Sequence, residues 1–420
     1  MSLPKPAPAR DKNRPQKPEA TARAAAMESI GVAEASFLAA FDNVLVDDPT
    51  HFDFNGAINR KHMRAVWNWL TRDVVPDLPQ EIETAVISDE PVEAVIDGMV
   101  PDILTKIRKI VTEAQTSAEV ERRLKVQLGG DDVRERLPVF INAFRCRSLL
   151  AKATAFGRAS NNLQDDAALG AALQSMPWKD AGIAALLLHA VVGQSANPSR
   201  LVSSMIPLAG GASEAIIKGA GFGPLIEAVL SHSQAQLSRI ANQNGLFVDA
   251  DLMCKAVSRF HKLVRSISGY VEFERGSRWS MMLTEITKQM AQRIEPRLRE
   301  ISPDLSQSLR RPREGADRVD PDRLLAALNG IYLLATLRDA RESLALNALF
   351  DTVWNETGQS LEVLLTRNLE VFKQNPDDEN TAHRLEMGIK MAEIRFNAEY
   401  ADILRRARDT ALNRRLERPA

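Results

Sequence analysis

The sequence predicts an all-α protein, organised as a multi-helix bundle or an irregular α-solenoid. From about Met27 onward, hydrophobic residues recur three or four positions apart, as at Ala33, Phe37 and Phe41. This spacing is the period of an amphipathic helix. Helix boundaries are also marked by proline and glycine. We find no sustained alternation of hydrophobic and polar residues, which is the pattern of a half-buried strand.

Helix starts are predicted where a capping side chain precedes proline, because proline at the first helical position loses no hydrogen bond. Four pairs have this form: Asn197-Pro198, Ser302-Pro303, Asp320-Pro321 and Asn375-Pro376. Gly129 and Gly358 follow helical segments and are predicted to end them, since glycine readily adopts the left-handed conformation found after a helix.

The chain divides into four predicted segments. Residues 1–26 contain five prolines and few apolar side chains, so we expect a disordered basic tail. Residues 27–301 form a helical body with a glycine-rich middle at 181–223. Residues 302–320 are rich in Pro, Arg and Asp and are predicted to be a linker. Residues 321–420 are predicted to form a C-terminal unit of three long helices.

The last of these helices is predicted to run from Thr381 to Leu416, roughly 54 Å at 1.5 Å per residue. Its hydrophobic stripe has spacings of three and four: Leu385, Ile389, Ala392, Phe396, Tyr400, Ile403, Ala407 and Ala411. We expect the stripe to pack on the two preceding helices of the same chain. An oligomer seam is the alternative, and Phe396 is the candidate contact residue.

Composition indicates a globular protein, with 45% hydrophobic and 26% charged residues. The two cysteines, Cys146 and Cys254, belong to no C-x-x-C pair, which favours a reducing, cytoplasmic location. The first 26 residues lack the apolar core of a signal peptide. The most apolar stretch, Ala181–Gly193, has 13 residues, fewer than the roughly 20 that a membrane-spanning helix needs.

Positive charge is concentrated at the two ends of the chain. Residues 1–26 carry a net charge of +4 and residues 403–420 another +4, so the body between them carries −9. Such ends can attract anionic partners or bind the chain's own acidic body. We expect nucleic acid or anionic lipid, if bound, to contact these termini. The candidate residues in the C-terminal segment are Arg405, Arg406, Arg408, Arg414 and Arg415.

Two tryptophans lie in a basic segment. Trp67 and Trp69 fall within Ile58–Val75, together with three arginines and a lysine, a combination that occurs in nucleic-acid-binding helices. Trp67 has the spacing of a residue on the apolar face of a helix. This favours an ordinary amphipathic helix whose basic residues face solvent. Trp69 is then predicted to be partly exposed and is a candidate interaction residue.

The glycine-rich middle, residues 181–223, contains seven of the 21 glycines. Its Gly219-Ala220-Gly221-Phe222-Gly223 run lacks the G-x-G-x-x-G spacing of a dinucleotide site, and no P-loop signature occurs. Glycine therefore serves here, by our interpretation, for close helix contacts or a tight interhelical turn. A partner-binding surface is the alternative, because flexible joints separate its apolar segments.

Two acidic clusters could hold a divalent cation. The run Asp131-Asp132-Val133-Arg134-Glu135 resembles the D-D-x-x-E pattern with which some all-α prenyl-diphosphate enzymes bind Mg²⁺, over five residues only. Asp377, Asp378 and Glu379 form the second cluster. Both follow Gly or Pro, where acidic residues favour a helix N-terminus, so we interpret both as helix starts and predict no metal or cofactor.

No convergent catalytic set is visible. The six histidines form no ligand pattern, and His189, within the most apolar stretch, is interpreted as a hydrogen-bonded core residue. Ser195 lacks the glycine and the preceding strand of a nucleophile elbow. The sequence thus favours a non-enzymatic helical interaction protein, such as a scaffold, adaptor or regulatory factor with a protein partner. The alternatives are an all-α enzyme with a site in residues 181–223 and a binder of nucleic acid or anionic membranes.

Overall fold

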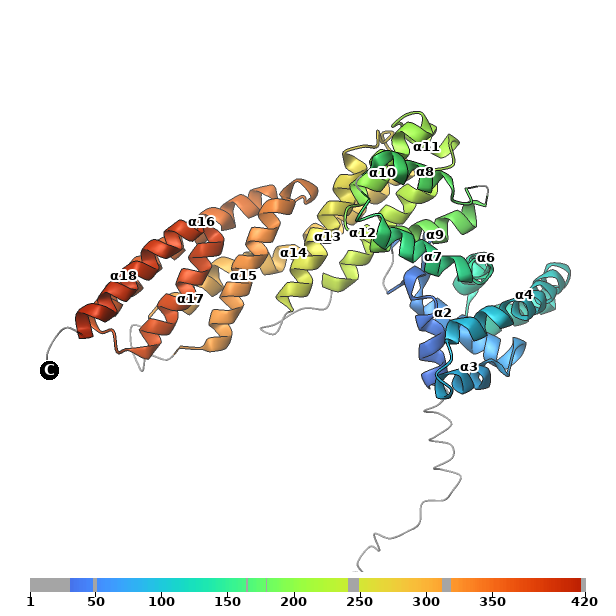
Figure 1. Cartoon of the computed structure of the whole chain (residues 1–420), viewed down its shortest axis with the longest axis horizontal. Helices are drawn as coiled ribbons and strands as arrows, with labels where there is room; N and C mark the ends of the chain where they lie inside the picture. Colours follow the sequence, from blue (N-terminus) through green and yellow to red (C-terminus); the bar gives the residue numbers. More distant parts are fainter. Residues whose placement is uncertain are drawn as a thin grey trace, which may run out of the picture. The chain divides into compact units, whose positions relative to one another are not determined.

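The computed structural model confirms the all-α prediction (Figure 1). It describes residues 31–47, 51–163, 165–178, 180–240, 249–311 and 319–416, with side chains as far as Asn413. The predicted tail, residues 1–26, lies outside the described residues. The only strands in the described ranges are β1 (Leu45–Val46) and β2 (Ile58–Asn59), which pair with each other.

The chain forms two compact units, which divide near Leu150. Unit 1 comprises residues up to Leu45 and Ile58–Leu150, and unit 2 comprises Val46–Ala57 and Ala151 onward. The described part of unit 1 begins with a helix over residues 31–39. It continues with η1 (Asp42–Val44), α2 (Arg60–Trp69), the π-helical turn η2 (Leu70–Val74), α3 (Leu78–Ile87), α4 (Val92–Thr116), α5 (Ala118–Leu128), α6 (Asp131–Arg145) and the first residues of α7 (Arg147–Ala159).

Aromatic rings form the core of unit 1. Phe37 lies 4.8 Å from Trp67 and 5.3 Å from Phe41, measured between ring centroids, and Phe41 meets Phe144 edge to face at 5.3 Å. All four side chains are almost completely buried. Offset and edge-to-face pairs of this kind stabilise a core beyond the apolar area that they bury, so three helices distant in sequence are fixed around one cluster.

Unit 2 contains the remaining helices. They are α8 (Asp166–Gln174), α9 (Ala181–Gln194), α10 (Pro198–Ala209), α11 (Glu214–Gly219), α12 (Gly223–Ile240), α13 (Ala250–Ser268), α14 (Arg278–Leu309), α15 (Pro321–Ala340), η3 (Arg341–Ser343), α16 (Asn347–Gln374), α17 (Glu379–Arg395) and α18 (Ala398–Leu416). Helix α9 is buried on every side from Ala184 to Val192, as its uniformly apolar sequence requires. It packs on α12, which packs on α13.

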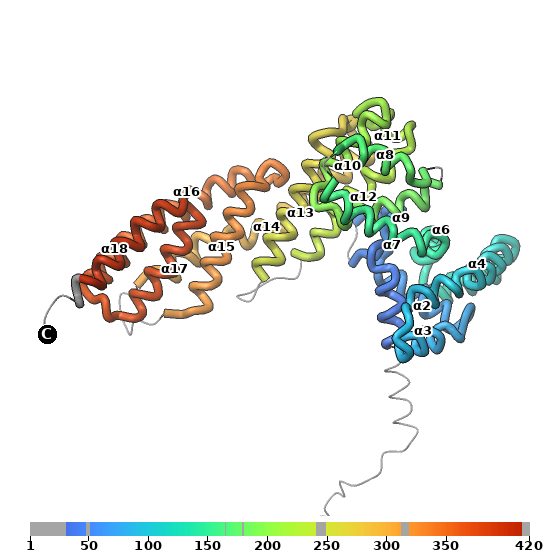
Figure 2. Tube along the Cα trace, in the orientation of Figure 1, coloured from blue at the N-terminus to red at the C-terminus, as the bar shows by residue number. Residues whose placement is uncertain are grey.

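The C-terminal part of unit 2 is a helix bundle, visible as the side-by-side helices of Figures 1 and 2. Helices α14, α15, α17 and α16 pack in that cyclic order, and α18 covers α16 and α17 from outside. Among the described residues, no helix combines the length and the apolar character needed to span a bilayer.

Two of the four predicted helix starts are found. Asn197-Pro198 begins α10, and Asp320-Pro321 begins α15, with the Asp320 carboxylate accepting from two backbone amides. Ser302-Pro303 instead lies inside α14. Pro303 is exposed, so water can hydrate the carbonyl that loses its partner, while Leu305 and Leu309 keep the helix packed. Of the predicted linker 302–320, residues 302–309 are helical and 312–318 lie outside the described residues.

Asn375-Pro376 does not begin a helix either. Asn375 ends α16, Pro376 lies in the following turn, and Asp378 caps α17 by accepting from the Asn380 amide at 3.3 Å. Gly129 ends α5 with a left-handed φ of 88°, as predicted. The prediction for Gly358 was wrong, because this residue lies within α16.

The prediction of one helix from Thr381 to Leu416 was also wrong. The chain reverses at Phe396 and Asn397, so α17 and α18 form an antiparallel hairpin. The Asn397 carboxamide accepts from the Tyr400 amide at 2.8 Å and thereby caps α18. The reversal also ends the predicted stripe: Leu385, Ile389 and Ala392 are buried, whereas Ile403 is 56% exposed.

Candidate functional site

The predicted C-terminal arginines are partly committed to the α17–α18 hairpin. Arg405 forms ion pairs with Glu393 of α17 and with Asp402, and Arg408 pairs with Glu386 of α17 at 2.8 Å. Arg406 is exposed, and its Nε donates to the Asp402 carbonyl at 3.3 Å. The side chains of Arg414 and Arg415 lie outside the described residues. Arg405 and Arg408 therefore have a structural role within this hairpin.

Trp69 is not the exposed residue that the sequence predicted. Its side chain is 0% exposed, because α2 buries a wide arc that includes Met63, Val66 and Trp67 as well. The basic face of this helix is also partly neutralised: Arg64 pairs with Glu34 at 3.1 Å, and Arg60 pairs with Asp42. The segment is an ordinary core helix, and Trp69 is not available for binding.

Phe396 belongs to an arginine–aromatic cluster, which we define as Arg338, Phe350, Trp354, Arg395, Phe396 and Tyr400. The Arg395 guanidinium lies 3.5 Å from the Trp354 ring centroid and donates to the Trp354 carbonyl. On the other side, Phe396 meets Tyr400 at 5.0 Å. Gly358 makes room for Arg395, since a Cβ there would lie 2.8 Å from a guanidinium nitrogen.

Arg395 is buried without an acidic partner within hydrogen-bonding distance in the described structure. Burial, and secondly the charge of Arg338, lowers the pKa of Arg395 to about 10. The guanidinium therefore stays charged at neutral pH, and the face of Trp354 stabilises it by a cation–π contact. The cluster connects α15, α16, α17 and α18 and stabilises their packing.

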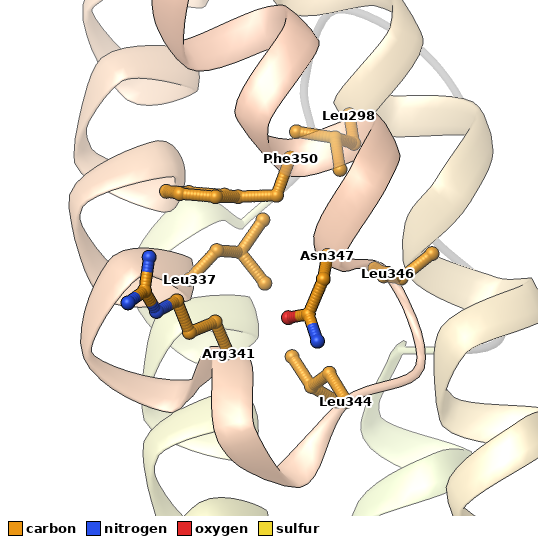
Figure 3. Close-up of a pocket in the computed structure, with 7 residues that line it drawn as sticks. All are labelled: Leu298, Leu337, Arg341, Leu344, Leu346, Asn347 and Phe350. Carbon is orange, nitrogen blue, oxygen red and sulfur yellow. The ribbon is translucent and has the colours of Figure 1, made fainter.

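A shallow apolar pocket lies beside this cluster (Figure 3). Four leucines and Phe350 form most of its wall, and the side chains of Asn347 and Arg341 complete the lining. Its accessible volume is about 10 Å³, roughly the space of one water molecule. The pocket is therefore too small for a substrate or cofactor of ordinary size.

The glycine-rich middle contains a buried pair of histidines. His189 and His232 stack with ring centroids 4.0 Å apart, His232 Nε2 donates to the His189 carbonyl at 2.8 Å, and Ser231 Oγ lies 3.3 Å from His189 Nε2. Burial, and secondly His189, lowers the pKa of His232 well below 6.5. Both rings pack between α9 and α12, and Gly193 leaves space for His232. The interpretation of His189 as a hydrogen-bonded core residue is confirmed.

The residues of both acidic clusters lie at helix starts. Asp131 and Asp132 occupy the first turn of α6, and Asp131 pairs with Lys125 at 2.6 Å. Asp378 caps α17, so both clusters are helix starts as predicted. Within the part of the chain that the structure describes, no three His, Cys, Asp or Glu side chains converge as metal ligands would.

An exposed apolar surface that the sequence analysis missed lies at the α3–α4 turn. Ile87 is 85% exposed and Val86 41% exposed, at the last turn of α3. Val92 and Val95, one turn apart at the start of α4, are half-buried. We name these four residues, together with the carboxylates of Asp89, Glu90 and Glu93, the α3–α4 surface. Among the large apolar side chains of the described residues, Ile87 has the highest exposed fraction.

The backbone of this turn is a Schellman motif. The Glu90 amide donates to the Ala85 carbonyl at 2.9 Å, and the Asp89 amide donates to the Val86 carbonyl. In this motif the residue just past the helix end is usually glycine. Asp89 occupies this position with a φ of +56°, the one non-glycine residue with positive φ among the described residues. Asp is among the residues that adopt this left-handed conformation readily, so Asp89 takes the place of glycine in ending α3.

Comparison of the chain with protein-family models, with curated proteins and with solved structures gives no match. The chemistry of its own surfaces is therefore the basis for assigning a function.

Proposed function

We propose that the chain is a non-enzymatic helical interaction protein, acting as a scaffold, adaptor or regulatory factor in the cytoplasm, and that a partner protein binds the α3–α4 surface. The observation that supports this proposal is the exposure of Ile87 beside Val86 in a well-packed helical unit. A fully buried isoleucine gains about 1.5–3 kcal/mol relative to an exposed one. A partner that covers Ile87 therefore recovers free energy that folding alone leaves unused.

The surroundings of Ile87 match the anatomy of a binding site. Interfaces commonly have a small apolar centre surrounded by polar residues that exclude water. Here the exposed apolar residues that end α3 are joined to the half-buried valines of α4 by a short turn whose residues, from Ser88 to Glu90, are polar and exposed. The backbone is fixed by helix ends on both sides, so little ordering is required when a partner binds.

The test is quantitative capture from the native cell with full-length wild type, Ile87→Ser and Val126→Ser chains. Val126 is a matched control because it is 76% exposed on α5 of the same unit. Ile87→Ser is expected to lower the recovery of the principal partner about tenfold, equivalent to about 1.4 kcal/mol of binding free energy. Val126→Ser should leave recovery unchanged. Equal recovery by all three chains, with unchanged melting temperatures, would refute the proposal.

A further inference from the structure

The α3–α4 surface lies in a stretch of uncompensated negative charge. Residues 73–105 contain nine Asp and Glu residues and no Lys, Arg or His. The two outermost carboxylates pair with flanking bases, Asp73 with Arg72 at 2.7 Å and Asp102 with Lys106 at 2.8 Å. The carboxylates between them form no ion pair in the described structure: Asp77, Glu81, Glu83, Asp89, Glu90, Glu93 and Asp97.

These carboxylates come from two helices that pack against each other. Helix α3 contacts α4, and the turn between them places Asp89 and Glu90 next to Ile87 in the chain. Because residues 73–105 contain no basic side chain, this stretch carries a negative potential, which salt screens over about 8 Å. Bound cationic groups would offset this negative potential. The apolar side chains and the negative charges therefore both favour a ligand that has an apolar face and basic groups.

We propose that the α3–α4 surface binds a basic amphipathic segment of the partner protein. Apolar side chains of that segment cover Val86 and Ile87, and its Lys or Arg side chains face Glu90 and Glu93. This inference rests on the proposed function and adds the chemical class of the partner. The proposed binding combines an apolar stripe with charge complementarity, as when an amphipathic helix binds a groove on a protein.

Other occupants fit this surface less well. The chain's own residues 1–26 are basic, but Met1 and Leu3 are their only large apolar residues, so they offer little cover for Ile87. A second copy docking through the same surface would set like charges against each other. Acidic proteins, nucleic acids and anionic lipids would be repelled. The occupant with both required properties is a basic segment with an apolar face.

The probe is a synthetic 18-residue peptide of leucine and lysine with all leucines on one helical face, titrated into the full-length chain. Two further peptides separate the contributions: one replaces each lysine by glutamate, and one has the same composition with leucines on every face. We expect the leucine–lysine peptide to bind most tightly. Binding should weaken about tenfold for Ile87→Ser and for a Glu90→Gln/Glu93→Gln double variant.

Val126→Ser is the matched control, since Val126 is exposed on the same helix as Arg122, Arg123 and Lys125, outside the acidic stretch 73–105. A zero-length carbodiimide crosslinker then locates the peptide on the wild-type chain, with amide links expected from peptide lysines to residues 81–97. Equal affinity of the lysine and glutamate peptides, affinity unchanged by the α3–α4 variants, or links only outside 81–97 would overturn the inference. Loss of native partner capture on Ile87→Ser would still support the proposed function, so the two can fail separately.

Discussion

Replacing Gly358 by alanine tests the arginine–aromatic cluster, because two opposing effects act at this position. Alanine in a helix interior is favoured over glycine by about 1 kcal/mol. A Cβ at residue 358, however, would lie 2.8 Å from a guanidinium nitrogen of Arg395 and 3.4 Å from its Cζ. Arg395 is buried, so its guanidinium has little space into which it can move.

The magnitude follows from what Arg395 would lose. Its charged hydrogen bond to the Trp354 carbonyl contributes about 1.5–3 kcal/mol, and its cation–π contact with Trp354 about 0.5–2 kcal/mol. After the helix-propensity gain of alanine is subtracted, we expect Gly358→Ala to lower the free energy of unfolding by about 1–4 kcal/mol. In an Arg395→Met background the obstacle is absent, so the same substitution should raise stability by up to about 1 kcal/mol.

Urea denaturation of the four chains in this double-mutant cycle, followed by circular dichroism, measures both effects. The prediction is a change of sign for Gly358→Ala between the two backgrounds. If Gly358→Ala stabilises the wild-type chain, Arg395 does not occupy the space that glycine leaves, and the described role of this residue pair is incorrect.

Three further predictions concern the fold. Trp69→Ala should cost about 3–5 kcal/mol of stability, as for a large core side chain; a loss below about 1 kcal/mol in denaturant titration would indicate an exposed residue. Asn397→Ala should cost about 1 kcal/mol through loss of the α18 cap, whereas Asn397→Asp should be nearly neutral in the same titration. Because burial lowers the folded pKa of His232 below its ordinary value of 6.5, the neutral ring contributes its stabilisation fully above pH 6.5, and this is lost as the pH falls below that value. Between pH 6.5 and 5.5, the free energy of unfolding of the wild-type chain should therefore fall by up to about 1.4 kcal/mol per pH unit more than that of His232→Gln. An equal dependence of unfolding free energy on pH for the two chains would contradict this.

Local sequence signals predicted the parts of the fold that local physics decides. The helical period identified the class. Asp320 and Gly129 marked real boundaries because they cap the adjacent helix ends. Asn197-Pro198 marked another through the proline, since Asn197 makes no side-chain cap. The hairpin at Phe396 and Asn397 also had a signal, since Asn397 followed by Glu399 is a typical helix start. The regular hydrophobic spacing across it concealed this boundary.

Tertiary packing decided the features that the sequence could not show. Gly358 resembles a helix end, but it lies within α16 because a guanidinium from another helix occupies its side. Trp69 lies outside the narrow stripe of α2, but neighbouring elements cover it as well. For the α3–α4 surface, the acidic stretch without basic residues was readable in the sequence. The exposure of Ile87 was not, because it depends on which helices pack against α3.

Amide hydrogen exchange of the full-length chain, alone and in complex with the partner captured from cells, tests the central claim most directly. Binding at the α3–α4 surface predicts slower exchange for the amides between Val86 and Val95 in the complex. The same amides should exchange at equal rates in Val126→Ser and wild-type complexes. Protection confined to other parts of the chain, with unchanged exchange from Val86 to Val95, would contradict the claim.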